Sequence, residues 1–146
     1  MRKILSPSFA ISVLALAVAI GGGAAWATAA APQATTVRCF NVAATAFQNH
    51  WRNYPATWGF HKAEVCKDSL GYVHLAGVIT AGPTDTTAFF LPKTDRPRVN
   101  HAFAVAAGTG TPALDDVDVF SNGSVFVFGP NNAAVALDGI TFRVGD

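Results

Sequence analysis

The side chains best suited to binding a ligand lie in one short aromatic segment. Tyr54 and Trp58 offer flat rings on which a sugar could stack, and Arg52 and Asn53 beside them could hydrogen-bond its hydroxyl groups. Trp51 precedes them, but packing in the core or between subunits is favoured for it because large aromatic side chains dominate buried area. Trp58 stands before a glycine in a loop-like segment, so we expect it to be exposed.

Covalent chemistry is predicted for the cysteines. Cys39 and Cys66 are the only two in the chain, and an oxidising compartment favours a disulfide between them. The alternative is a pair of buried free thiols. A bridge closing a loop of this length would stabilise the fold by about 3 kcal/mol.

Catalytic residues are not expected. Glu64 is the only glutamate, and a glycosidase needs a second carboxylate across the sugar, which nothing in the sequence pairs with it. No serine lies in a G-x-S-x-G motif. We therefore expect no enzymatic activity. The alternative is a secreted hydrolase of cell-wall polysaccharide with Glu64 as its acid or base.

Metal ligands and cofactors are not predicted either. Asp115, Asp116 and Asp118 form an acidic cluster that lacks the glycine and distal glutamate of a calcium loop, so a solvated strand face or loop is favoured. The histidines show no tight ligand spacing, and a zinc site would have to be assembled from distant segments. They are His50, His61, His74 and His101.

The first 31 residues have the layout of a secretory signal peptide. Arg2 and Lys3 precede an apolar block at residues 9–20, and small residues then offer cleavage after Ala27 or Ala31. An uncleaved membrane anchor is the alternative, although three consecutive glycines weaken a spanning helix. We expect residues 32–36 to be a flexible tail and residues 37–146 to be the folded domain of a secreted, extracellular protein.

Charge excludes nucleic acid as a partner. Cleavage would remove Arg2 and Lys3 and leave eight Lys and Arg against nine Asp and Glu, a net charge of −1. Such a chain lacks the basic footprint that nucleic acid requires. A membrane is a partner only if the N-terminal segment stays uncleaved.

Alternating side chains predict the central strand of the domain at residues 71–79. Val73, Leu75 and Ile79 are expected in the core, with Tyr72 and His74 facing outward or toward a neighbouring subunit. Further short runs are separated by Gly, Pro and Asn turns without an amphipathic helix. Together they predict an all-β fold, a single antiparallel β-sandwich or jelly roll.

Two later segments carry local predictions. Asn122-Gly123 predicts a hairpin with a type I′ turn. The alternation slips at Asp138-Gly139, which predicts a bulge inside one long terminal strand. On the second strand of this hairpin, Phe126 and Phe128 point to one side and two valines point to the other, so both faces of the strand are apolar. One of these faces is expected at a subunit interface.

An ordered set of motifs resembles the C-terminal β-sandwich, the receptor-binding or tip domain, of bacteriophage tail-fibre proteins. The set is K-D-x-x-G-x-V-x-L-x-G, then L-P and R-P, then L-x-G-I-x-F, within residues 51–144. The matching segments are residues 51–53, 67–79, 90–92, 96–97, 123–125 and 137–143. The resemblance implies a domain that is commonly a homotrimer and serves as a structural or host-surface-binding tip, in many cases recognising saccharides. With the export signal, it indicates a cellular secreted protein with a borrowed fold.

These observations lead to one main hypothesis. The chain is a secreted, non-enzymatic β-sandwich that binds a cell-surface glycan or forms an oligomeric surface structure. The hydrolase using Glu64 and a purely structural coat protein are the alternatives.

Overall fold

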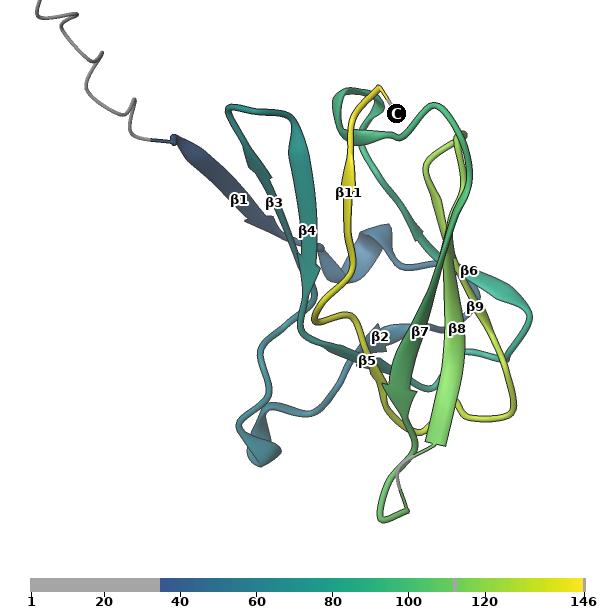
Figure 1. The fold of residues 1–146 in the computed structure, drawn as a ribbon. Coiled ribbons are helices and arrows are strands. Elements are labelled where there is room, and N and C mark those ends of the chain that lie inside the picture. Colours follow the sequence, from purple (N-terminus) through teal and green to yellow (C-terminus); the bar gives the residue numbers. More distant parts are fainter. Residues whose placement is uncertain (1–34, 112, 146) are drawn as a thin grey trace, which may run out of the picture. The chain divides into compact units, whose positions relative to one another are not determined.

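The computed structural model describes residues 35–111 and 113–145 as two sheets in which every strand pairing is antiparallel (Figure 1). The smaller sheet has the order β1 (Val37–Asn41), β3 (Glu64–Asp68), β4 (Tyr72–Ala76), β11 (Thr141–Arg143). The larger sheet has the order β2 (Arg52–Asn53), β5 (Val78–Thr80), β10 (Val135–Ala136), β7 (His101–Ala107), β8 (Ala113–Val119), β9 (Ser124–Phe128), β6 (Thr86–Phe90). The predicted all-β antiparallel sandwich is confirmed.

In the described part of the chain, three single turns of 3₁₀ helix interrupt the connections: η1 (Ala44–Ala46), η2 (Ala56–Trp58) and η3 (Lys93–Asp95). Among the described residues, no helix is both long and apolar enough to cross a membrane. The predicted signal peptide at residues 1–31 lies outside the described residues, as does most of the predicted tail at residues 32–36.

The core follows the alternation of the strands. Val73, Leu75 and Ile79 are buried as predicted, while Tyr72 and His74 are exposed. β7 alternates in the same way. Its residues at even positions are exposed, and those at odd positions face the core: His101, Phe103, Val105 and Ala107.

The prediction of one strand over residues 71–79 is wrong. The chain leaves the smaller sheet after β4, passes Gly77, and enters the larger sheet as β5. Gly77 has a φ of +93°, and a Cβ there would collide with the backbone carbonyl of Lys62. Glycine is needed for both reasons, because other residues disfavour this φ and no side chain fits.

The prediction of a bulge in one long terminal strand is also wrong. β10 belongs to the larger sheet and β11 to the smaller one, and Asp138-Gly139 lies between them. Gly139 has a φ of +90°, which turns the chain from one sheet to the other. The slip in alternation therefore marks a change of sheet, since each strand keeps its own apolar side toward the shared core.

The β8–β9 hairpin forms where it was predicted, but its turn is not type I′. Of Asn122 and Gly123, both described, only Gly123 has a positive φ, at +92°. The Gly123 amide donates to the Phe120 carbonyl at 2.8 Å, and the Phe120 amide donates to the Ser124 carbonyl at 2.9 Å. This is the longer hairpin loop in which a turn is followed by one left-handed glycine. Asn122 instead accepts the Ser124 amide through its side-chain oxygen at 2.8 Å.

Candidate functional site

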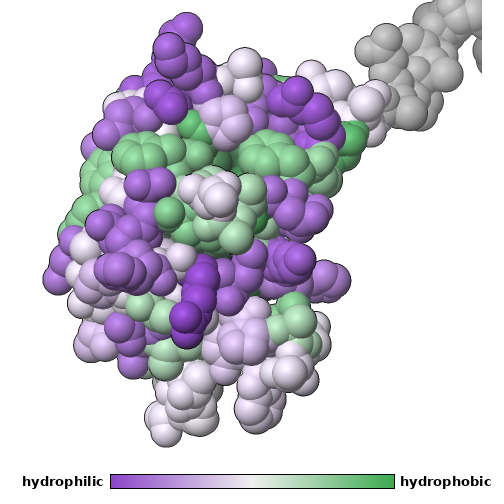
Figure 2. All heavy atoms as spheres, turned by 180° about the vertical axis from the view of Figure 1, so that it is seen from behind, coloured by the Kyte–Doolittle hydropathy of each residue, from purple (hydrophilic) through white to green (hydrophobic). Residues whose placement is uncertain are grey.

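A groove with an aromatic wall lies between two loops at one end of the larger sheet. One loop contains η2, and the other connects β7 to β8; both project at the lower end of Figure 1 and form the pale projections at the lower edge of Figure 2. The groove has a volume of about 420 Å³, within the range of small-molecule sites. It is lined by Tyr54, Trp58, Phe60, Gly108, Thr109, Gly110 and Ala134.

Hydrogen bonds and ring packing hold the aromatic wall. The Tyr54 amide donates to the Val78 carbonyl at 2.9 Å, which ties the start of the loop to β5. Gly59 adopts a left-handed conformation and closes η2 by donating its amide to the Ala56 carbonyl at 3.0 Å. The rings of Tyr54 and Phe60 meet edge to face with their centroids 5.5 Å apart. Such pairs are favourable beyond simple area burial, so the packing between Tyr54 and Phe60 stabilises this part of the wall.

Two of the four predicted ligand-contact residues line this groove, and two do not. Tyr54 lines it, and Trp58 does so with 72% of its surface exposed. Asn53 instead accepts the Ala63 amide through its side-chain oxygen at 2.7 Å, a contact that shapes the start of β3. Arg52 is exposed on β2, where it pairs with Thr80.

Sequence reasoning missed Phe60 and the whole facing wall. Phe60 continues the aromatic segment and could have been included on that ground. Residues 108–110 offered no such signal, because Gly-Thr-Gly reads only as a strand breaker. They are about fifty residues away along the chain, and only the pairing of β10 with both β5 and β7 brings them near.

Trp51 has the structural role that was favoured for it. It is 2% exposed and donates its indole N–H to the Thr86 hydroxyl at 3.0 Å. Gly82 packs directly against its ring, where a Cβ would collide. Trp51 therefore supports the larger sheet from inside.

The acidic cluster divides between the two sides of β8. Asp115 is buried and accepts the backbone amide and the side-chain amide of Asn131, each at 3.2 Å, so the prediction of a solvated face is wrong for this residue. Asp116 is exposed on the outer side and Asp118 is half-buried there. Burial raises the pKa of Asp118, and the neighbouring carboxylate of Asp116 raises it further.

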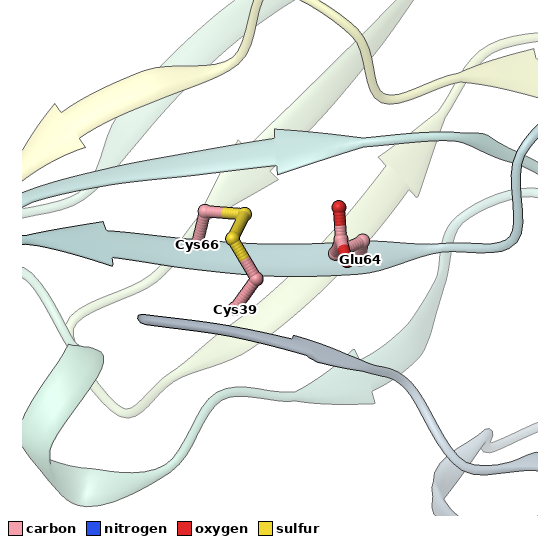
Figure 3. A group of neighbouring side chains, drawn as sticks. All are labelled: Cys39, Glu64 and Cys66. Atoms are coloured by element: carbon pink, nitrogen blue, oxygen red, sulfur yellow. A yellow bond between two sulfur atoms is a disulfide. The ribbon is translucent and has the colours of Figure 1, made fainter. Parts of the chain in front are cut away.

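The predicted disulfide is present. Cys39 and Cys66 face each other directly in the β1–β3 register, with their Cα atoms 4.0 Å apart (Figure 3). Glu64 lies beside the bridge, and in the described ranges these are the one group of three neighbouring side chains of the kinds that can bind a metal ion. Both sulfurs are committed to the disulfide, so they are not available as thiolate ligands.

The histidines in strands have structural contacts. His74 is on the outer side of β4, as predicted, and its Nδ1 lies 2.9 Å from the Thr141 hydroxyl. His101 stacks between Phe103 and Phe142, which links the two sheets through the core.

A buried ion pair lies at η3. The Asp95 side chain is 1% exposed, and its Oδ1 is 2.6 Å from the Lys67 ammonium and 3.7 Å from the Arg38 guanidinium. Lys67 also donates to the Thr94 carbonyl at 2.6 Å. These contacts fasten the η3 connection to β3.

Comparison with solved structures shows which known protein has a similar fold. The receptor-binding protein gp15 of Listeria phage PSA has a similar structure, with a TM-score of 0.64 and 14% sequence identity over 99% of this chain and 82% of that one. No protein-family model matches the sequence, and no curated protein matches it. The likeness is one of fold, the β-sandwich that the tail-fibre motifs implied.

Proposed function

We propose that this protein is a secreted, non-enzymatic surface-binding module that holds a cell-surface saccharide in the groove between the η2 loop and the β7–β8 loop. The observation that carries the proposal is the exposed ring of Trp58 beside Tyr54 and Phe60, opposite a wall of small residues. Aromatic faces in a cleft are suited to the C–H faces of a sugar. The similar fold of a phage receptor-binding protein supports a surface-binding role.

The chemistry of the lining favours a neutral ligand. No charged side chain lines the groove within residues 35–111 and 113–145, so an anionic or cationic group would lose its hydration without gaining a partner. The polar side-chain groups of the lining are the Tyr54 and Thr109 hydroxyls and the Trp58 indole N–H. Hydroxyl-rich and uncharged ligands fit this surface.

The test is a binding screen of the purified protein against cell-wall preparations and immobilised glycans. Trp58→Ala should weaken the binding of a retained glycan about tenfold, because one stacking ring contributes about 1 kcal/mol or more. Trp58→Phe should retain most of it. Leu70→Ala is the matched control, since Leu70 is also largely exposed, at 60%, but lies in the turn between β3 and β4, outside the groove. Equal affinities for Trp58→Ala and Leu70→Ala would contradict the proposal.

The hydrolase alternative is less well supported. Glu64 lies on β3 beside the disulfide and is not among the residues that line the groove. Turnover of cell-wall polymer that disappears in Glu64→Gln would favour the hydrolase over the binding module.

A homotrimer is a further part of the proposal, motivated by the outer side of the larger sheet. Phe126 and Phe128 lie there with ring centroids 4.5 Å apart, and Leu114 and Phe90 are exposed nearby on β8 and β6. Burying this apolar surface between copies would be favourable. Sedimentation equilibrium should give three times the monomer mass, and Phe128→Asp should give monomers. A monomeric mass for the unaltered protein would rule out this part.

A further inference from the structure

A second, smaller pocket opens beside the groove and shares four of its residues. Phe60, Gly108, Gly110 and Ala134 line both spaces, so the two are continuous along one surface. The smaller pocket has a volume of about 220 Å³. This is below the usual range of about 300–1,000 Å³ for an independent small-molecule site, so it suits one substituent of a ligand held in the groove.

The floor of the inner pocket is a row of small apolar side chains across three strands. Val78 on β5 pairs with Ala136 on β10, and Ala106 lies alongside on β7. Phe60 and the glycines at 108 and 110 complete the walls. No charged or hydroxyl-bearing side chain of the described residues lines this pocket.

We propose that this inner pocket receives the methyl group of an acetamido substituent, which makes the ligand an N-acetylated amino sugar. The inference rests on the proposed function of the groove: the sugar ring stacks at Tyr54 and Trp58, and the acetyl group points toward Ala106 and Ala136. An acetyl methyl gains from leaving water in such a pocket. A hydroxyl or an ammonium at the same position would lose part of its hydration without gaining a polar side chain as a partner.

The inference is tested by comparing the affinities of the protein for acetylated and non-acetylated sugars. A missing or extra methyl-sized group in an apolar pocket changes affinity about tenfold or more. The unaltered full chain should therefore bind oligosaccharides of N-acetylglucosamine or N-acetylgalactosamine at least about tenfold more tightly than glucose, galactose or deacetylated glucosamine oligomers of the same length. Isothermal titration with these purified oligosaccharides measures the difference.

A pair of variants on β7 separates this inference from the proposed function. Ala106 is exposed, lines the inner pocket and does not line the outer groove, so Ala106→Val should remove the tenfold preference while binding to the plain sugar is retained. Ala104→Val is the matched control, because Ala104 is exposed on the same side of β7 outside the pocket.

The outcomes are distinguishable. Tighter binding of the acetylated sugars that Ala106→Val abolishes and Ala104→Val leaves intact supports the inference. Equal affinity for acetylated and plain sugars, with both lost in Trp58→Ala, overturns the inference and leaves the groove as a saccharide site. Absence of binding to every oligosaccharide overturns both.

Discussion

Gly77 and Asp138 meet where two segments of the chain pass from one sheet to the other. One segment runs from β4 to β5, and the other from β10 to β11. The Gly77 amide donates to Asp138 Oδ1 at 3.1 Å, and the Gly77 carbonyl accepts the Leu137 amide at 2.8 Å. β4 pairs with β11 on one side of this junction, and β5 pairs with β10 on the other. The two segments thus form one continuous two-stranded ribbon that bends from one sheet into the other. The hydrogen bonds at the junction connect the two sheets of the sandwich.

Alanine substitutions at two glycines should separate the destabilisation caused by steric collision from that caused by an unfavourable φ. Gly77→Ala should lower the free energy of unfolding by about 3 kcal/mol or more, because the added Cβ meets the Lys62 carbonyl at an unfavourable φ. Gly139→Ala is the matched control: its φ of +90° is similar, but no atom lies within 4 Å of the added Cβ. That variant should lose only about 1–2 kcal/mol. Urea unfolding measures both, and equal losses would contradict the crowding at Gly77.

The disulfide should contribute substantially to stability. It closes a loop over a sequence separation of 27 residues that includes η2 and its aromatic wall. A Cys39→Ser/Cys66→Ser double variant should therefore lose about 3 kcal/mol of unfolding free energy. Reducing agent should cause a similar loss in the unaltered protein and none in the double variant. Two alkylatable thiols in the denatured, unreduced protein would show that the bridge is not formed.

The charge of the buried Asp95 carboxylate should be compensated mainly by one of the two cations beside it. Lys67 is 23% exposed and in direct contact with it, so Lys67→Met should destabilise the fold by about 3 kcal/mol by leaving the charge uncompensated. Arg38 is farther away and 68% exposed, so Arg38→Gln should lose less than about 1 kcal/mol. Denaturation of both variants gives the comparison, and similar losses would mean that the Lys67 contact is not the main compensation.

Asp118 predicts a specific pH dependence. Burial, and to a lesser extent Asp116, raises its folded-state pKa above the ordinary value. The contribution of Asp118 to the free energy of unfolding therefore increases as the pH falls through that raised pKa and decreases as the pH rises. Asp118→Asn should therefore be more stable than the unaltered protein at about pH 7, and this advantage should vanish below about pH 3.9, where the carboxyl is protonated in both states. Urea unfolding at both pH values tests this, and an equal advantage at both would contradict it.

The contribution of Asp116 to the raised pKa of Asp118 can be measured directly. Removing its charge with Asp116→Asn should lower the pKa of Asp118 toward the ordinary value without restoring it fully, since burial is the larger cause. NMR titration of the Asp118 carboxyl measures the shift. An unchanged pKa would assign the whole effect to burial.

The sequence by itself determined the fold class, the disulfide and the central core residues. Alternation with period two identifies Val73, Leu75 and Ile79 because a half-buried strand needs one apolar side, and the cysteine pair was predicted from the expectation of an oxidising compartment. The exposed position of Trp58 and the buried position of Trp51 were readable from their neighbours and their size. These are local properties, and local rules suffice for them.

Only the tertiary structure decided which sheet each strand joins and what the aromatic segment faces. A glycine or a slip in alternation is compatible with a bulge, a bend or a change of sheet, and the choice at Gly77 and Asp138 depends on contacts some sixty residues apart in the sequence. The same holds for the groove, where Trp58 faces a Gly-Thr-Gly loop with no chemical signature of its own. Long-range strand pairing brings these segments together, and no short-range pattern encodes it.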